Sequence, residues 1–388
     1  MNLVCHVITK LELGGAQEVA LGVVSSLDRG LFRAVLIAGP GGILLDEAKT
    51  LPEVEVRIIS SLVREISPFN DLRALVQLVL AFRQLRPTIV HTHSSKAGIL
   101  GRLAAWMAGV PTIVHTIHGY GITPLQPGWV RRILIALEWL IGRITTFWIA
   151  VSNADLKQGL RWRLFTKETV LLVRPGIDPE PFTARKEGAM RDRLRLELGV
   201  APSGILIGTV ACLKPQKAPE DFVKVAALIS QEFPEARFIL VGDGELRGRI
   251  ERLVNESLLS DRFQLLGWRR DIPILMNALD VFVLTSRWEG LPCVLLEARA
   301  AAIPIVAMNV GGAEEAIDEG THGWLCQRGD IEGMARRVCR VLHEKHRGFG
   351  VVRPPDVFPQ EFTIDETVRR YQDLYKRLVA THHSQLAL

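Results

Sequence analysis

The chain of 388 residues is poor in cysteine, and its five cysteines follow no binding pattern. None belongs to a C-x-x-C pair, and none has a companion histidine at zinc-finger spacing. Disulfide frameworks and structural zinc sites depend on such spacings. We therefore expect free thiols, as in a reducing cytoplasm, and no structural zinc.

A long apolar run and a leader segment are also missing. The longest stretch without Asp, Glu, Lys or Arg covers 103–130, and prolines, glycines and histidines interrupt it. Such a stretch does not predict a membrane span. The first four residues include no basic group ahead of an apolar run, so we expect no signal peptide.

Acidic residues are scarce in one part of the first half. Residues 72–167 carry 12 basic residues against two acidic ones, Glu138 and Asp155, whereas 181–388 carry 28 of each sign. The net charge of +5 therefore arises in the first half. A basic region of this kind favours a phosphate-rich partner, which is a nucleic acid, a nucleotide or an anionic membrane.

Short β-branched runs alternate with longer helical patterns along most of the chain. Strands are predicted at 2–8, 32–38, 54–59, 88–92, 112–116, 146–151, 169–173, 205–211, 237–241, 262–266, 280–284 and 304–307. Helices are predicted between them, for example at 15–27, 69–85, 96–108, 129–143, 218–232, 245–256 and 292–302. Strict alternation predicts parallel sheets covered on both faces.

A segment rich in proline and glycine at 174–179 separates the two series of strands. We predict an α/β chain with two doubly wound, Rossmann-like domains at 1–178 and 179–361. Residues 362–388 should form a C-terminal helix that packs back on the first domain. Two such domains imply a ligand in the interdomain cleft, at the carboxyl ends of the strands.

Two groups of residues in the first half follow predicted strands. Gly14 and Gly15 come after the first strand and open a helix, either as an anion site made of backbone N–H groups or as a tight turn. Four histidines follow two further strands: His91, His93, His115 and His118. We expect His91 and His115 to be buried and hydrogen-bonded, and we place His118 on the substrate.

Several signatures of other enzymes are absent. The sequence has no P-loop, no G-x-S-x-G and no Asp-x-Asp pair, which a metal-dependent nucleotide-sugar enzyme would use to hold diphosphate through a divalent ion. Residues 242–248 resemble a dinucleotide fingerprint, but Arg247 stands at the third glycine, so we interpret them as a turn. A site without metal needs basic side chains, and Lys217 follows a strand where one would fit.

Two glutamates separated by seven residues follow the strand at 280–284. Glu289 lies in the turn, and Glu297 lies in a helix that is otherwise apolar. Gly290 and Leu291 offer backbone N–H groups just before that helix. A carboxylate in apolar surroundings needs strong hydrogen-bond donors, which a ribose diol supplies. The alternative, a pair of surface glutamates, fits the apolar context less well.

Together these features resemble the retaining glycosyltransferases of family 4. The resemblance rests on Gly14–Gly15, His118–Gly119, Lys217, the Glu289–Glu297 pair and residues 311–315, in that order, and it covers almost the whole chain. It implies the GT-B fold, with the acceptor mostly on the first domain and a nucleotide-sugar on the second. It also implies that the enzyme needs no metal and no other cofactor.

The resemblance also implies a role for each matching residue. Glu297 would bind the ribose hydroxyls, and Lys217 would bind the diphosphate. Glu289 would bind the donor sugar, with Gly290 and Leu291 nearby through their backbone. Gly15 would contact the leaving phosphate, and His118 the sugar or the developing charge. Trp268 and Arg269 would border the nucleobase. The resemblance implies that His118, Glu289 and Lys217 are the catalytic residues.

The sequence departs from the family at Cys212, where many members have an arginine beside the diphosphate. Loss of one charged hydrogen bond costs about 1.5–3 kcal/mol unless another group replaces it. Lys214 or a base of the first domain are candidates. The family transfers with retention, either with the leaving phosphate taking the acceptor proton or, less favoured, through Glu289 as a nucleophile.

The segment 129–143 mixes tryptophans, large apolar residues and three arginines, and Arg161, Trp162 and Arg163 follow it. It fits either a helix in the interface of an anionic membrane or one packed on the sheet with its arginines in solvent. The membrane alternative would place the enzyme on the inner membrane face.

The reaction that the resemblance implies is hexosyl transfer from a nucleotide-diphosphate sugar, with UDP favoured, to a saccharide or lipid-linked acceptor in glycan synthesis. The rival interpretations are a silent nucleotide-sugar-binding protein, suggested by Cys212, and a GT-B sugar-nucleotide epimerase, which would lack the Glu289–Glu297 arrangement. Nucleic-acid binding is not expected, because no module for it is present.

Overall fold

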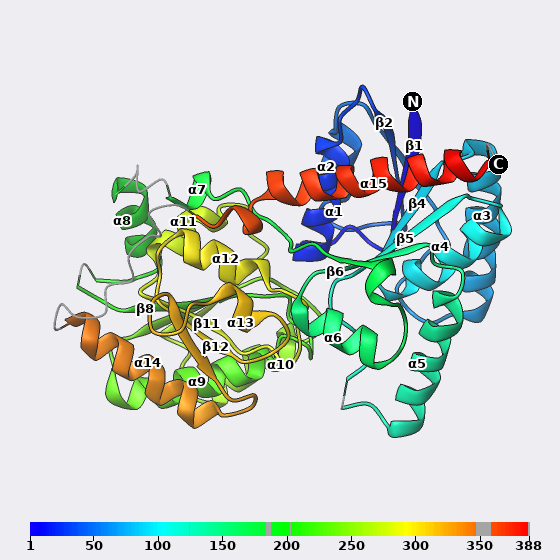
Figure 1. The fold of residues 1–388 in the computed structure, drawn as a ribbon. Helices are drawn as coiled ribbons and strands as arrows, with labels where there is room; N and C mark the ends of the chain where they lie inside the picture. The colour runs from blue at the N-terminus through cyan, green and yellow to red at the C-terminus, as the bar shows by residue number, and fades with distance from the viewer. Residues whose placement is uncertain (124, 184–187, 202, 347–357, 387–388) are drawn as a thin grey trace. The chain divides into compact units, whose positions relative to one another are not determined.

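The computed structural model describes residues 1–123, 125–183, 188–201, 203–346 and 358–386 (Figure 1). The chain divides into two compact units, here unit 1 (Met1–Gly176 with Glu361–Leu388) and unit 2 (Ile177–Gln360). Each unit has its own parallel sheet, so the prediction of doubly wound α/β domains is confirmed. Within the described residues, no helix is both long and apolar enough to span a membrane.

Unit 1 is built on a seven-stranded parallel sheet in the order β3-β2-β1-β4-β5-β6-β7. Its strands are β1 Asn2–Ile8, β2 Phe32–Ala38, β3 Val54–Ile58, β4 Ile89–His93, β5 Thr112–Ile117, β6 Phe147–Ala150 and β7 Val170–Leu172. The central strands β1, β4 and β5 are buried along almost their whole length. Burial on both faces explains their continuous apolar runs.

Helices cover both faces of this sheet. They are α1 Gly15–Ser26, α2 Leu45–Thr50, α3 Pro68–Leu85, α4 Ser95–Met107, α5 Gly128–Gly142, α6 Asn153–Arg161 and α15 Ile364–Leu386, with the 3-10 turns η1 Lys167–Thr169 and η2 Gln360–Phe362. Helix α6 was not predicted, although Ser152 caps it by accepting the N–H of Asp155 at 3.1 Å.

The C-terminal helix α15 belongs to unit 1 although it follows unit 2 in the sequence (Figure 1). It packs on α1, and a Cβ added at Gly22 would lie 2.9 Å from the Ile364 side chain. The Thr367 hydroxyl donates to the Arg174 carbonyl at 2.9 Å. Buried Tyr371 and Tyr375 point into the unit and bring two hydroxyl groups to the sheet.

Unit 2 is built on a six-stranded parallel sheet in the order β10-β9-β8-β11-β12-β13. Its strands are β8 Leu206–Val210, β9 Arg237–Val241, β10 Phe263–Gly267, β11 Val281–Leu284, β12 Ile305–Met308 and β13 Gly323–Cys326. Its helices are α7 Glu180–Thr183, α8 Gly188–Glu197, α9 Pro219–Glu232, α10 Arg247–Glu256, α11 Ile272–Ala278, α12 Cys293–Ala300, α13 Ala313–Ala316 and α14 Ile331–His346.

The edge strand β13 was not predicted. It has four residues, begins at a glycine and pairs only with β12. Its sequence, Gly-Trp-Leu-Cys, has no β-branched residue, unlike the equally short β6, β11 and β12. The core of unit 2 is nonetheless continuous, because aliphatic and aromatic side chains of β8, β9 and β11 pack against α9, α10 and α14.

Candidate functional site

The order of strands in each sheet reverses at one point, and the loops there hold most of the predicted site residues. In unit 2 the reversal lies between β8 and β11, which pair in parallel through Ile207 and Val281. In unit 1 it lies between β1 and β4. Open α/β sheets bind ligands at such points, outside the carboxyl ends of the strands.

At the reversal point of unit 2, Lys217 and Glu289 form a close ion pair. Lys217 lies between β8 and α9, and Glu289 lies between β11 and α12. The Lys217 ammonium donates to Glu289 Oε1 at 2.5 Å, and the two side chains are 17% and 6% exposed. The structure therefore brings together two residues that lie 72 positions apart in the sequence.

Two residues that the sequence analysis missed hold this pair. The Gln216 amide donates to the Trp288 carbonyl at 2.9 Å and to Glu289 Oε2 at 3.4 Å. The Thr285 hydroxyl lies near the backbone oxygens of Lys217 and Ala218, at 3.2 and 3.1 Å. No sequence pattern marks Gln216 or Thr285, because these contacts join two loops that meet only in the sheet.

The glycines at 311 and 312 bring a third loop against Glu289 and Gly290. Gly311 has φ +56°, and a Cβ there would lie 2.2 Å from the Glu289 carbonyl oxygen. The Gly312 N–H donates to the Gly290 carbonyl at 2.5 Å. Any larger residue would push this loop away, so the glycines fix the backbone of Glu289. Gly290 and Leu291 are buried directly before α12.

The other predicted residues of unit 2 lie on α12 and directly after β10. Glu297 is half-buried on α12. Trp268, 37% exposed, and Arg269 follow β10, which is separated from β8 by β9. Neighbouring strands lie about 4.8 Å apart, so β10 and β8 are about 10 Å apart. Arg269 already binds Asp271 through two hydrogen bonds of 2.7 and 2.5 Å.

The glycine turn at 242–244 packs against the loop that carries Lys217. Gly242 has φ +129°, and a Cβ there would lie 2.1 Å from the Ala211 carbonyl oxygen. The Leu213 N–H donates to the Asp243 carbonyl at 3.0 Å. The backbone of this turn lies so close to the neighbouring loop that only glycine fits at 242, as expected for a turn. Arg247 is paired with Asp243 at 2.9 Å.

Unit 1 places Gly14 and Gly15 at the start of α1, beside its own reversal point. The Gly14 carbonyl accepts the N–H groups of Gln17 and Glu18, both at 3.0 Å, which begins the helix. Gly14 precedes the first helical residue, Gly15. The N-terminus of a 12-residue helix therefore opens where an anion would be stabilised by its dipole.

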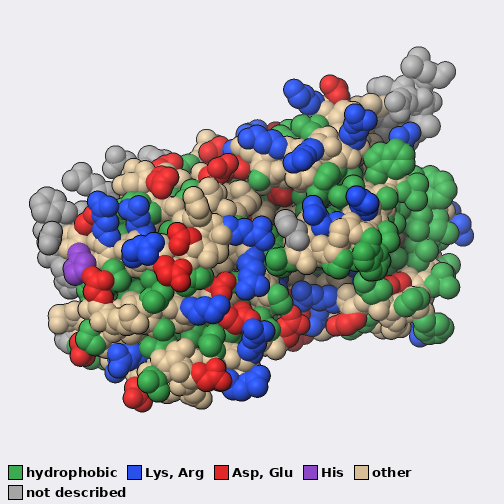
Figure 2. Space-filling view, turned by 90° about the horizontal axis from the view of Figure 1, so that it is seen from below, with side chains coloured by type: hydrophobic (Ala, Val, Ile, Leu, Met, Phe, Trp, Pro, Cys, Tyr) green, Lys and Arg blue, Asp and Glu red, His purple; other side chains and the backbone are tan. Residues whose placement is uncertain are grey.

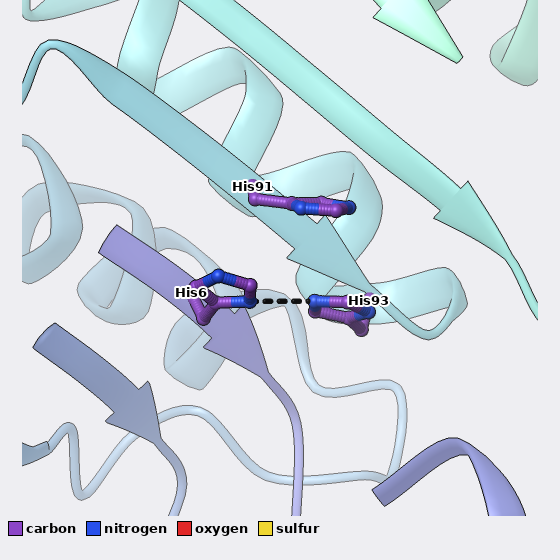
Figure 3. A group of neighbouring side chains, drawn as sticks. All are labelled: His6, His91 and His93. Atoms are coloured by element: carbon purple, nitrogen blue, oxygen red, sulfur yellow. Dashed lines mark hydrogen bonds between the residues drawn. The ribbon is translucent and has the colours of Figure 1, made fainter. Parts of the chain in front are cut away.

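Beside it lies a cluster of histidines that includes three buried rings, from β1 and β4 (Figure 3). His6 and His93 share a hydrogen bond of 3.0 Å between Nδ1 and Nε2, and the His91 and His93 rings stack at 4.4 Å. His93 Nδ1 in turn contacts Nε2 of half-buried His118 at 3.0 Å. His118 therefore lies at the outer end of a buried network.

The structure buries His91 and His115 with hydrogen bonds, as expected. His91 contacts Thr116 and Tyr375 at 2.7 and 2.5 Å. His115 contacts Thr92 at 2.8 Å and packs so closely on α4 that a Cβ at Gly98 would lie 2.6 Å from its ring. Burial lowers the pKa of His6 to about 3 and that of His118 to about 4, so both rings are neutral at pH 7.

The ligand atoms of His6, His91 and His93 all lie within 4.8 Å of one another, close enough for a metal ion to bind all three. However, all six of their ring nitrogens have hydrogen-bond partners. Coordination would therefore break several of these bonds. The donor set fits a hydrogen-bonded network better than a resident metal.

Two family models together match most of the chain. The model described as Glycosyltransferase Family 4 matches residues 13–181, and that described as Glycosyl transferases group 1 matches residues 190–348. An Escherichia coli relative, named UDP-Gal:alpha-D-GlcNAc-diphosphoundecaprenol alpha-1,3-galactosyltransferase, is 32% identical over 380 residues, which is 97% of each chain. The N-acetyl-alpha-D-glucosaminyl L-malate synthase of Bacillus anthracis is 29% identical over 74% of each chain.

Solved structures show the same fold. Anabaena HepE in complex with UDP and glucose superposes with a TM-score of 0.81, at 22% identity, over 97% of this chain and 100% of that one. WaaG, a glycosyltransferase involved in lipopolysaccharide biosynthesis, superposes with a TM-score of 0.72 at 15% identity, over 95% of each chain. The fold is thus GT-B, and the chain belongs to the group 1, family 4 glycosyltransferases.

Proposed function

We propose that this glycosyltransferase moves a hexosyl group from a nucleotide-diphosphate sugar, with UDP favoured, to a saccharide or lipid-linked acceptor. Transfer proceeds with retention and without a metal ion. The observation that carries the proposal is the ion pair of Lys217 and Glu289 at the reversal point of unit 2. It holds a half-buried cation where α/β sheets bind their ligands.

The chemistry of the pair fits a diphosphate donor. The Lys217 ammonium has three N–H groups, and Glu289 accepts one of them, so others can bind phosphate oxygens. The backbone N–H groups of Gly290 and Leu291 lie before α12, where the helix dipole favours an anion. A cation and a helix end can thus perform the charge neutralisation that other enzymes assign to a divalent ion.

The remaining residues complete the donor site in this proposal. Glu297 binds the ribose hydroxyls, and Trp268 and Arg269 border the base. Gly15 supports the leaving phosphate, and His118 contacts the sugar. Because Glu289 is bound by Lys217, its carboxylate is a poor nucleophile, which favours attack on the face that the leaving phosphate departs from.

The names of similar proteins support the choice of substrates. The Escherichia coli relative is named for UDP-Gal and for a GlcNAc-diphosphoundecaprenol acceptor. Anabaena HepE was solved in complexes with UDP and glucose and with UDP-glucose. Both favour a UDP-sugar donor here, and the first favours an acceptor on a lipid carrier.

A lipid-linked acceptor also fits the surface of unit 1, where hydrophobic side chains gather (Figure 2). Helix α3 exposes Leu72, Val76 and Leu80 on one face, and α5 exposes Trp129, Ile133 and Leu140. Only Ile141 of α5 is buried, so this helix is not simply packed on the sheet. Unlike these side chains, Trp162 packs inward, with its ring 4.8 Å from that of Tyr120.

Positive charge accompanies this apolar surface. Arg73 and Arg83 of α3 and Arg132 of α5 are exposed, as is Arg143 at the end of α5, whose guanidinium lies 5.2 Å from the Trp139 ring. Apolar side chains with arginines around them bind the interface of an anionic bilayer. We therefore propose that α3 and α5 dock this enzyme on the anionic face of the membrane that carries its acceptor.

The direct test is a donor panel with a lipid-linked acceptor. We expect release of UDP, a product with the anomeric configuration of the donor by NMR, and full activity in EDTA. Inversion, or loss of activity in EDTA that magnesium restores, would contradict the mechanism. Nucleotide binding without turnover would support a silent binder, and interconversion of the sugar nucleotide without acceptor would support an epimerase.

Vesicle flotation tests the membrane surface. We expect binding to phosphatidylglycerol vesicles that salt weakens, and little binding to phosphatidylcholine. Trp129→Gln with Ile133→Gln should weaken it. Leu196→Gln, at an equally exposed leucine of unit 2, serves as the matched control. Equal flotation of both variants would remove α5 from the docking surface.

A further inference from the structure

Six hydrogen bonds join the C-terminal helix α15 to His118 in an unbranched series. Tyr371 OH contacts Thr116 Oγ1 at 3.1 Å, and Thr116 Oγ1 contacts His91 Nε2 at 2.7 Å. On the other side of the His91 ring, Nδ1 contacts Tyr375 OH at 2.5 Å, and Tyr375 OH contacts His6 Nε2 at 3.2 Å. His6 Nδ1 then contacts His93 Nε2 at 3.0 Å, and His93 Nδ1 contacts His118 Nε2 at 3.0 Å. We call these seven groups the relay. Each inner histidine uses both of its ring nitrogens, and each inner hydroxyl contacts two members of the series.

The members of the relay are neutral, because the fold buries them without a carboxylate partner. His6, His91, His93, Tyr371 and Tyr375 are at most 1% exposed. Burial holds the pKa values of His91 and His93 well below the usual range and raises that of Tyr375 well above it. A neutral imidazole donates through one nitrogen and accepts through the other, and a hydroxyl has one proton to donate.

These rules limit the relay: either all protons point toward His118, or one hydroxyl among Tyr371, Thr116 and Tyr375 is left without an acceptor in the series. If protons point toward His118, Tyr371 donates to Thr116, and each following group donates to the next. If they point the other way, Thr116 donates to Tyr371, and the Tyr371 proton has no acceptor among the described residues. A buried donor without a partner is costly. The relay therefore points from α15 to His118.

We propose that Tyr375 is a positioning residue that, through His6 and His93, fixes His118 as the Nδ1–H tautomer, so that His118 donates a hydrogen bond to an oxygen of the sugar or the phosphate. His118 accepts from His93 at Nε2, so its remaining proton sits on Nδ1. This deepens the proposed function and rests on the contact of His118 with the donor. It makes His118 an electrostatic donor rather than a general base.

Imidazole NMR tests the tautomer without any substrate. In protein labelled with 15N-histidine, and with His118 assigned by His118→Gln, we expect protonated Nδ1 and unprotonated Nε2 at pH 7.5. A protonated Nε2 on His118 in the wild type would overturn the proposal. Stoichiometric Zn²⁺ binding that His6→Gln abolishes would overturn it too, because a metal would replace the bonds of the relay.

Two tyrosine variants on α15 form a matched pair. Tyr375→Phe cuts the relay between His91 and His6, so His118 should become a mixture of tautomers. Tyr371→Phe removes only the terminal phenol, and Thr116 can still donate to His91, so the His118 tautomer should be kept. Equal spectra for the two variants would contradict the relay, and the wild-type spectrum decides the matter even where Tyr375→Phe folds poorly.

Kinetics separates this inference from the proposed function. We expect Tyr375→Phe to lower kcat roughly 10- to 100-fold, as losses of a residue that orients a functional histidine do, with the KM for the donor little changed. If His118→Ala keeps full turnover while the NMR shows Nδ1–H, the role of His118 fails and the relay stands. If His118 matters but carries Nε2–H, the relay fails and the proposed function stands.

Discussion

The relay of unit 1 and the ion pairs of unit 2 bury polar groups in different ways, although unit 1 also buries Arg102 beside Glu138 at 2.7 Å. Unit 1 gathers neutral imidazoles and hydroxyls, each bound to the next by a hydrogen bond. Unit 2 buries charges as pairs, with Glu289 against Lys217 and Asp280 between Arg195 and Lys345, at 3.1 and 2.6 Å. The hydrogen bonds of unit 1 form a neutral series in which the protons point one way, whereas the pairs of unit 2 carry charge.

The difference suits two different tasks. A cation that is only partly exposed can bind and neutralise a phosphate, because its charge is little screened by water. A neutral series of hydrogen bonds cannot supply charge, but it fixes which atom carries a proton. The comparison therefore predicts that changes in unit 2 act on donor charge, whereas changes in the relay act on orientation and stability.

The largest effect should follow Lys217→Ala. It removes the cation of the site and leaves the buried Glu289 carboxylate unpaired beside the phosphates, so kcat should fall about 10²- to 10³-fold. The measurement is UDP release at saturating donor. Lys224→Ala, at an exposed lysine of the same unit, is the control. Wild-type kinetics in Lys217→Ala would rule out Lys217 as the diphosphate ligand.

Glu297→Ala should weaken donor binding by about 1.5–3 kcal/mol, or roughly 10- to 100-fold in Kd, because a carboxylate would no longer accept the ribose hydroxyls. Calorimetry with UDP measures it. Glu332→Ala, at an exposed glutamate of unit 2, is the matched control. Tyr371→Phe in unit 1 should leave the Kd for UDP unchanged. Weaker UDP binding in that variant would contradict the division of roles between the two units.

Tyr375→Phe should cost unit 1 about 1–3 kcal/mol in free energy of unfolding, because buried His6 and His91 each lose a partner. Urea unfolding gives the value. Tyr120→Phe is an unusual control, since the buried Tyr120 hydroxyl has no hydrogen-bond partner among the described residues. Its removal should be neutral or stabilising, and equal losses would contradict the relay.

The last prediction concerns mild acid, and its effect is shared among several histidines. The pKa of His6 falls from 6.5 unfolded to about 3 folded, and that of His118 to about 4, so the unfolded chain binds more protons below pH 6.5. Each such histidine lowers the free energy of unfolding by up to about 1.4 kcal/mol per pH unit as pH falls through that window. Well above pH 6.5 these histidines no longer lower the free energy of unfolding.

Hydrogen exchange at pH 7.5 and 5.5, corrected for intrinsic rates, resolves the two units. Unit 1 should lose protection first, because five histidines there have lowered pKa values. In the described part of unit 2, burial lowers the pKa of His322 alone among the histidines. Earlier loss of protection in unit 2 would show that its ion pairs, not the histidines, limit acid stability.

Most of the sheet architecture was predictable, because central parallel strands are buried on both faces and appear as β-branched runs. The misses have local reasons. Strand β13 has no β-branched residue, unlike the equally short β6, β11 and β12, and it pairs with β12 at the edge of the sheet. Helix α6 carries a signal that went unused, since Ser152 and Asp155 stand at the spacing of an N-cap.

The candidate site was predictable in part. The pattern Glu289–Glu297 and the position of Lys217 after a strand marked two loops that the structure brings together at the reversal point of unit 2. Nothing in the sequence showed that Lys217 and Glu289 form an ion pair. Gln216 and Thr285 were missed for the same reason. The roles of Glu297, Trp268, Arg269, Gly15 and His118 in donor binding stay predictions.

The sequence by itself determined the alternation of strands and helices, the charge of the first half and the loops proposed for the candidate site. These depend on neighbours in the chain. Only the tertiary structure decided that α15 lies with unit 1 and that Tyr375 enters a series of histidines from β1, β4 and the end of β5. The sense of a hydrogen-bond series depends on the hydroxyl groups within it, and one of these, Tyr375, comes 257 positions after His118 in the sequence.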